Sequence, residues 1–152
     1  MIRKQILEEP TARQGKWLDV GSLARFEITS EDPAHPIDNA LKEGGKGWRA
    51  GADGPQAIRM TFDSPQSISK IIVLFEENDS ARTQEFTISW CASGSAEWRE
   101  IVRQQFNFSP PGTSKEREEF NIPLKDAIGI ELRIIPNMSG NGRASLRELL
   151  IG

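Results

Sequence analysis

Short segments in which apolar and polar residues alternate recur along most of the chain. Ile58, Met60 and Phe62, for example, alternate with polar residues, which is the period of a half-buried β-strand. The pattern predicts strands at residues 24–30, 56–62, 68–76, 84–91, 97–104, 116–122, 128–135 and 144–151. Because Gly, Pro, Asn and Ser separate these short strands, the sequence predicts an all-β sandwich or barrel.

Some segments depart from simple alternation. Residues 71–75 are apolar at every position, which is typical of a strand covered on both faces. The alternation breaks at Ile101 and Val102, which indicates a β-bulge. Residues 37–42 have a short helical pattern. The polar opening, residues 1–22, is expected to be an N-terminal arm packed on a single domain of residues 23–152.

The connections between the strands predict where a binding site lies. If successive strands are antiparallel, successive connections fall at alternate ends of the fold. One end then receives the longer segments 31–55, 77–82, 103–115 and 137–143, and the other receives short turns at 63–67, 92–96 and 123–127. Long loops on one rim of a rigid scaffold are where binding sites usually lie, so we expect the ligand at the first end.

Polar and aromatic side chains of these rim segments are the candidate ligand contacts. They are His35, Asn78, Arg82, Phe108, Asn141 and Arg143. Arg82 is the strongest candidate, because it begins a strand, so its backbone is fixed while its guanidinium head is expected to be free for bidentate hydrogen bonds. The alternative for Arg82 is a salt bridge to Glu77 or Asp79.

The aromatic residues of the rim leave two alternatives open. Trp48 offers a flat apolar surface on which a sugar can stack, but it also suits a core anchor at the base of its loop. Phe106 and Phe108 share one face of an extended segment, so either one reaches the rim or both lie in the core. Trp90 and Trp98 lie in strand patterns and are expected in the core.

Composition and charge exclude several classes of function. The 19 basic and 22 acidic residues leave a net charge of −3, which argues against a nucleic-acid binder. Acidic and basic residues are balanced in the rim segments, which favours neutral sugars or a protein partner over phosphate or an anionic membrane. A glycosidase would need two converging carboxylates, and no motif supports the available pair, Asp38 and Asp79, so no enzyme activity is predicted.

The single Cys and single His exclude further classes. Cys91 has no partner for an internal disulfide, and one Cys with one His cannot form a Cys/His zinc site. A Ser-His-Asp site would have to use His35. The sequence has neither a signal-peptide pattern nor an apolar run long enough for a membrane helix, and a cytoplasmic protein is expected.

Several motifs, in the correct order, resemble those of discoidin-type (coagulation-factor type C) domains. PIDNAL followed by GWRA is similar to the family's "NAIDG…TWS" segment, and the closing ASLREL is similar to its "ASLxEL". Further similarities are found at residues 56–63, 82–90, 97–101 and 130–134. The resemblance covers roughly residues 23–152. It implies an antiparallel, galactose-binding-like jelly-roll β-sandwich of about eight strands.

The resemblance also implies ligands and a metal. Members of the family bind carbohydrate, phospholipid headgroups or proteins through loops on one rim, and some hold a structural calcium ion. Lys42 stands where the family often has a calcium-binding Asp, so no cofactor is predicted and calcium is not expected to be needed for folding. The weak candidates for a calcium site are Asp38, Glu43 and Glu148, and Glu148 has the alternative of bonding loop backbone N–H groups.

Together these observations predict a non-catalytic binding module, with a carbohydrate bound by the loops of one rim. The alternative is an intracellular protein-interaction or assembly module with no sugar ligand. That alternative predicts an apolar patch or a broad polar face without a pocket, and it is compatible with a homo-oligomer.

Overall fold

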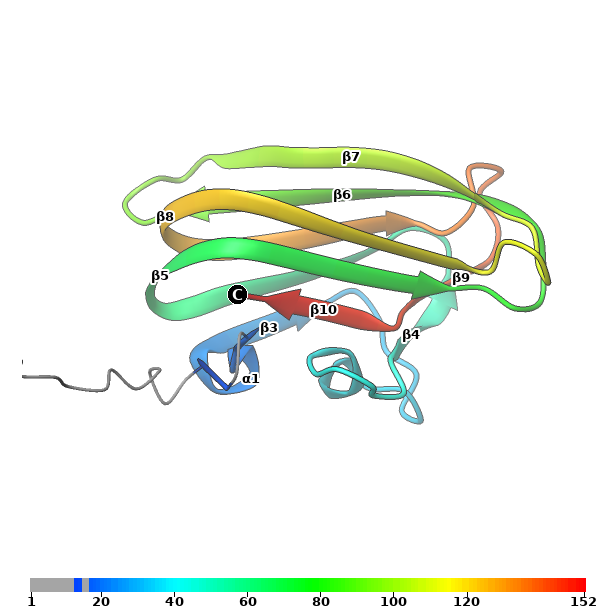
Figure 1. Ribbon diagram of the computed structural model, residues 1–152, viewed down its shortest axis with the longest axis horizontal. Coiled ribbons are helices and arrows are strands. Elements are labelled where there is room, and N and C mark those ends of the chain that lie inside the picture. Colours follow the sequence, from blue (N-terminus) through cyan, green and yellow to red (C-terminus); the bar gives the residue numbers. More distant parts are fainter. Residues whose placement is uncertain (1–12, 15–16) are drawn as a thin grey trace, which may run out of the picture.

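The chain folds into a β-sandwich (Figure 1). The structure, a computed structural model, describes residues 13–14 and 17–152. In chain order the elements are β1 (Arg13–Gln14), β2 (Trp17–Leu18), α1 (Val20–Leu23), β3 (Ala24–Ile28), the 3₁₀ helix η1 (Ile37–Ala40), β4 (Trp48–Asp53), β5 (Gln56–Glu76), β6 (Arg82–Ala92), β7 (Trp98–Phe108), β8 (Lys115–Ile135), β9 (Arg143–Leu146) and β10 (Glu148–Ile151). The predicted antiparallel sandwich is therefore confirmed.

Two long strands, β5 and β8, organise the molecule. They pair antiparallel from Gln56 opposite Ile134 to Glu76 opposite Lys115, and both fold over near their midpoints, at the left of Figure 1. The sequence predicts four separate strands here because polar residues interrupt the alternation at both bends. In the bend of β8, Asp126 has a φ of 54°, a left-handed conformation that Asp tolerates better than most residues.

The folded strands produce the two layers of the sandwich. One layer contains β3, the first half of β5, the second half of β8, β6 and β7. The other contains β10, the second half of β5 and the first half of β8. The short pair β4–β9 lies beside them.

The core fills the space between the layers. Ile88, Ile130 and Leu132 are buried as the alternation predicts, and Trp90 is partly buried against the same core. Ring contacts join the layers: the centroids of Phe75 and Phe86 lie 5.2 Å apart.

Trp98 was expected in the core, but it lies on the outer face of its layer with 36% of its surface exposed. The cause is the bulge in β7, which is confirmed: Val102 pairs with Ile88 and Glu100 with Ser89, so Ile101 has no partner. The extra residue at the bulge shifts the alternation by one position, so every side chain that precedes it in β7 points to the opposite face of the sheet. The ring of Trp98 lies over Gly129, where a Cβ would come within 2.6 Å of it.

The rim predicted from antiparallel connectivity is also confirmed. The connections that follow β5, β7 and β8 gather at the right of Figure 1, and the bends and the β6–β7 turn lie at the opposite end. Backbone hydrogen bonds join the rim segments, from Glu77 N to Ser114 O and from Gly54 N to Gly142 O. The segment 31–55, expected as a loop, contains η1 and the strand β4.

The predicted N-terminal arm, residues 1–22, lies largely outside the described residues. Within the described part, the side chains of Leu18 and Val20 are buried with the main core. No helix among residues 13–14 and 17–152 is long and apolar enough to cross a membrane.

A carboxyl group is buried on the inner face of β8. Glu116 is only 2% exposed. Burial raises its pKa to about 7, a hydrogen bond from Gln104 opposes this rise, and the charge of Glu118 adds to it. The side-chain amide of Gln104 donates to Glu116 at 3.2 Å and to Glu118 at 2.7 Å.

This carboxyl group makes stability depend on pH. Between the ordinary pKa of 4.5 and the folded value of about 7, the unfolded chain loses this proton while the folded chain keeps it. The free energy of unfolding should therefore fall as pH rises through this window, and Glu116 should contribute about 2–3 kcal/mol of that fall. Chemical denaturation of wild type and Glu116→Gln from pH 4 to pH 8 measures it. The variant should gain stability relative to wild type as pH rises, and a difference that does not change with pH would contradict the prediction.

Candidate functional site

Two adjoining hollows open at the loop rim. The first, here called the rim cleft, has a floor of Trp48 and Leu146 and is lined by the polar side chains of His35, Lys46, Arg49, Glu76, Asn78, Ser145 and Arg147. The second, the outer hollow, is lined by Arg49, Glu77, Asp79, Ser80, Ala81, Arg82, Asn137, Asn141, Gly142 and Arg143. Arg49 lines both hollows, so together they form one continuous surface.

The floor of the rim cleft is built by β4. The indole N–H of Trp48 donates to the carbonyl of Ser30 at 3.3 Å, and the hydroxyl of Ser30 accepts from the backbone N–H of Gly51 at 2.9 Å. Trp48 is 1% exposed, so the interpretation as a core anchor is confirmed. Because side chains alternate along a strand, the burial of Trp48 directs its neighbour Arg49 outward.

Arg147 reaches the cleft because its neighbour is a glycine. Gly47 has a φ of +84°, and a Cβ there would lie 2.8 Å from the carbonyl oxygen of Leu146 and 3.1 Å from Cα of Arg147. The backbone N–H of Arg147 donates to Leu74 O at 2.8 Å, which ties this part of the chain to β5. In the β4–β9 pair Arg49 lies opposite Ser145, and Arg147 comes directly after the end of β9 and lines the same cleft as Arg49.

Arg82 has a structural position, and the expectation of a free guanidinium head is wrong. Its residue is 8% exposed, its Nε lies 2.7 Å from Oε1 of Glu77, and its Nη1 donates to the carbonyl of Pro136 at 2.6 Å. The guanidinium carbon also lies 5.2 Å from the ring centroid of Phe108. Burial lowers the pKa of Arg82, and the charge of Glu77 raises it. The alternative interpretation, a salt bridge to Glu77, is confirmed.

Phe108 is likewise corrected. It is 1% exposed and packs against Phe106, with ring centroids 4.9 Å apart, so it cannot contact a ligand at the surface. Phe106 is partly buried against the same core. Strand β7 extends to Phe108, beyond the predicted end at residue 104, and carries both rings inward.

The other four predicted site residues line the two hollows. His35 and Asn78 lie at the rim cleft, and Asn141 and Arg143 lie at the outer hollow. Nδ1 of His35 is 3.6 Å from Oδ2 of Asp32. A hydrogen bond from the backbone N–H of Ala34 lowers the pKa of Asp32, and the charges of His35 and Arg143 lower it further, against the opposing effect of burial.

Sequence reasoning missed the cleft residues that β4 and its neighbours provide: Lys46, Arg49, Glu76 and Arg147. A signal was present, because Trp48 and Ala50 alternate with Arg49 and Gly51. The several glycines around this stretch made it look like an irregular loop.

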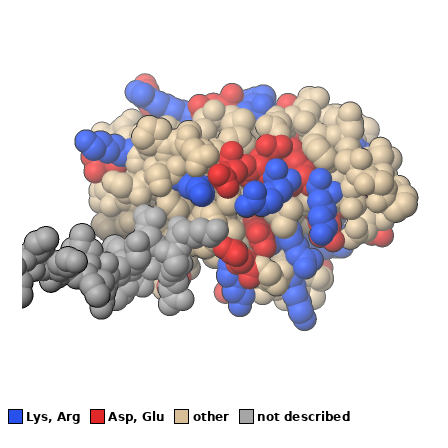
Figure 2. Space-filling model, in the orientation of Figure 1, with Lys and Arg blue, Asp and Glu red and all other residues tan. Residues whose placement is uncertain are grey.

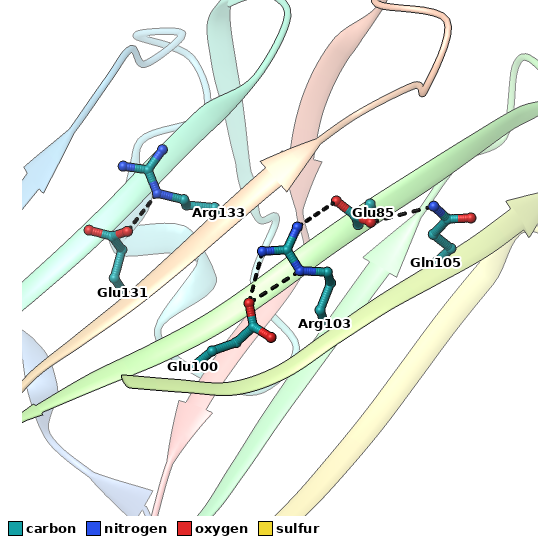
Figure 3. Close-up of polar contacts among 6 residues, drawn as sticks. All are labelled: Glu85, Glu100, Arg103, Gln105, Glu131 and Arg133. Carbon is teal, nitrogen blue, oxygen red and sulfur yellow. Dashed lines mark hydrogen bonds and ion pairs between the residues drawn. The ribbon is translucent and has the colours of Figure 1, made fainter. Parts of the chain in front are cut away.

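A second polar surface lies on the outer face of the layer that contains β6 and β7 (Figure 3). There Arg103 lies between Glu100 at 2.8 Å and Glu85 at 3.5 Å, and Arg133 lies 2.7 Å from Glu131. Burial alone would raise the pKa of Glu131, but hydrogen bonds from Arg59 and Arg133 outweigh it and lower that pKa. The charges of this network neutralise one another, which is typical of a solvated surface.

Two of the three calcium candidates, Glu43 and Glu148, have other partners. The carboxylate of Glu148 accepts a hydrogen bond from the backbone N–H of Gly44 at 2.8 Å, as its alternative interpretation predicted. The carboxylate of Glu43 accepts one from the indole of Trp17. Among the described residues, no group of three or more His, Cys, Asp or Glu side chains, including Asp38, is placed to hold a metal ion.

The fold and the rim define a β-sandwich whose loops present a polar cleft at one end. A family model described as F5/8 type C domain matches residues 26–149, and the chain belongs to this family. No curated protein sequence matches the chain.

Solved structures with the same fold include three carbohydrate-binding modules. A pectin-binding module is 20% identical, with a TM-score of 0.60, over 86% of this chain and 90% of that one. The family 32 module of AlyQ, in complex with 4,5-unsaturated mannuronic acid, is 20% identical, with a TM-score of 0.59, over 86% and 95%. The family 32 module of C. perfringens NanJ, in complex with galactose, is 18% identical, with a TM-score of 0.61, over 86% and 93%. At these identities the likeness concerns the fold.

The buried environment of Arg82 predicts a loss of stability on truncation. Arg82→Ala should lower the free energy of unfolding by about 3–5 kcal/mol, because it leaves the carboxylate of Glu77 without its partner. Arg143→Ala, on the same rim but exposed, should change it by less than about 0.5 kcal/mol. Urea denaturation of both variants measures this. A loss below about 1 kcal/mol for Arg82→Ala would show that the guanidinium is free after all.

The positions of the calcium candidates predict that a chelator has little effect. The midpoint of thermal unfolding should be the same in EDTA as in excess calcium, because Glu148 bonds the loop backbone and Lys42 adds a positive charge to the same loop. Differential scanning calorimetry measures it. A drop of several degrees in EDTA would show that a bound calcium ion stabilises the fold.

Proposed function

We propose that this chain is a non-catalytic carbohydrate-binding module that holds its ligand in the rim cleft. Membership of the F5/8 type C family supports this, and so does the likeness of fold to modules whose solved complexes contain galactose or 4,5-unsaturated mannuronic acid.

The observation that carries the proposal is the convergence of hydrogen-bonding side chains at one open cleft. His35, Asn78 and Arg147 come from three segments far apart in the sequence and meet over the buried floor of Trp48. Sugar hydroxyls both donate and accept hydrogen bonds, so they suit an imidazole, an amide and a guanidinium beside the carboxylate of Glu76. Backbone hydrogen bonds tie two of these segments to neighbouring strands, from Arg49 N to His35 O at 3.1 Å and from Arg147 N to Leu74 O at 2.8 Å, which lowers the entropic cost of binding.

Stacking plays little part in this mode of binding. The carbohydrate hypothesis calls for an exposed aromatic ring at the rim, with Phe108 among the candidate contacts, but Trp48 and Phe108 are each 1% exposed. Recognition through polar groups at an open cleft lacks the favourable free energy that a sugar gains when it buries apolar surface against an aromatic ring. We therefore expect a modest affinity that depends strongly on the pattern of hydroxyl groups on the sugar.

Asn78 tests the location of the binding site. Its amide donates to Glu76 at 2.9 Å, and its residue is exposed at the cleft. Asn78→Ala should weaken binding of a sugar identified on a glycan array by roughly three- to tenfold in isothermal titration calorimetry. Asn121→Ala makes the same change on an exposed part of β8 outside both hollows and should leave the affinity unchanged. Equal affinities for both variants would place the site elsewhere.

A further inference from the structure

We infer that the rim cleft selects saccharides that carry an anionic group, a carboxylate or a sulfate, and that Arg49 and Arg147 bind this group together. The inference rests on the proposed function and adds the chemical class of the ligand. It departs from the expectation of a neutral ligand that the balanced composition of the rim favours.

The cationic side chains of the cleft have no counter-charge of their own. Within the described part of the chain, neither Lys46 nor Arg49 nor Arg147 has a carboxylate within ion-pair distance. Arg103, in contrast, lies between two carboxylates in the network of Figure 3. The cleft thus brings together three cationic side chains that have no ion-pair partner among the described residues.

The acidic residues near the cleft are held by other groups. Glu31 accepts a hydrogen bond from the backbone N–H of Ile37 at 2.6 Å, and Glu148 accepts one from Gly44 at 2.8 Å. Glu77 is paired with Arg82. The one carboxylate in the lining of the cleft, Glu76, accepts from the amide of Asn78. The neutral donors do not cancel these negative charges, but the lining of the cleft itself contains three cationic side chains, Lys46, Arg49 and Arg147, and one carboxylate, that of Glu76. A balanced count of charges along the rim therefore conceals an unbalanced cleft.

The positions of the two arginines suit an anion placed between them. Arg49 and Arg147 line the same cleft. Arg49 pairs with Ser145 of β9, and Arg147 follows the end of that strand directly. Like charges this close repel, and an anion between them offsets the repulsion. Two guanidinium groups also present planar pairs of N–H donors, which match carboxylate and sulfate oxygens.

The surface around the cleft carries charges of both signs. In Figure 2, Lys and Arg side chains gather around the loop that enters β4 and the junction of β9 and β10, and a patch of Asp and Glu directly borders them. The outer hollow contains the carboxylates of Glu77 and Asp79 beside its arginines, so the clearest excess of positive charge lies in the rim cleft.

The test compares pairs of ligands that share a sugar and differ in whether it carries an anionic group. Trigalacturonate and its fully methyl-esterified form have the same ring hydroxyl groups, and calorimetry with the intact chain measures both affinities. Galactose 6-sulfate and galactose form the second pair, which tests a sulfate group. The anionic member of at least one pair should bind tenfold or more tightly than its neutral partner, and this advantage should shrink as NaCl is raised from 20 to 300 mM. The pair of ligands that shows the advantage identifies the anionic group as a carboxylate or a sulfate.

Charge-removing variants locate the anion. Arg49→Gln should reduce the advantage of the anionic sugar several-fold while leaving the affinity for its neutral partner almost unchanged. Arg147→Gln, which also removes a donor to sugar hydroxyl groups, should weaken binding of both partners and reduce the advantage of the anionic one several-fold. Arg99→Gln removes an exposed arginine on β7, outside both hollows, and should have no effect. Lys46→Gln, at an exposed loop position, provides a second variant if Arg147→Gln fails to fold.

The outcomes separate the two proposals. Equal affinity for the charged and neutral members of both pairs would overturn the anionic selectivity and leave sugar binding standing. An advantage that persists in Arg49→Gln and Arg147→Gln would overturn the assignment to these arginines. No binding to any sugar on the array would overturn the proposed function and the inference together.

Discussion

The pairing of β5 with β8 is the interaction on which the rest of the structure depends. Each strand starts at the rim, bends at the opposite end and returns, so all four ends of the pair meet at the rim. Hydrogen bonds between the two strands run from Gln56 and Ile134 to Glu76 and Lys115 and fix the two layers of the sandwich relative to each other. A loop attached to any of these ends is therefore placed at the rim by the register of the long pair.

The rim cleft then depends on the small β4–β9 pair beside this frame. Trp48 is locked by its bond to Ser30, and Gly47 leaves room for Arg147, so the two arginines point outward from a rigid base. Arg82, in contrast, is buried and bound by the carboxylate of Glu77 and the carbonyl of Pro136. The rim thus contains one arginine that stabilises the fold and others whose charge faces solvent.

Much of the fold could be predicted from the sequence because alternation reports which face of a strand is buried. It could not show that residues 56–76 form one bent strand, since a bend and a break have the same polar signature. The bulge at Ile101 was predicted, but its consequence for Trp98 depends on register, which pairing partners determine. The site residues were harder to predict from the sequence than the fold. His35 and Asn78 were found from loop position alone, whereas the burial of Arg82 and Phe108 and the exposure of Arg49 depend on contacts between distant segments.

The most direct test of the rim as the binding surface is a map of amide chemical-shift changes in the ¹⁵N-labelled chain during titration with a sugar that binds. The amide signals of Gly47, Asn78 and Arg147 should shift most. The amide signals of the turns at residues 63–67, 92–96 and 123–127 should not change. The largest changes in those turns, or on the outer face around Arg103 and Glu131, would contradict a binding site at the rim.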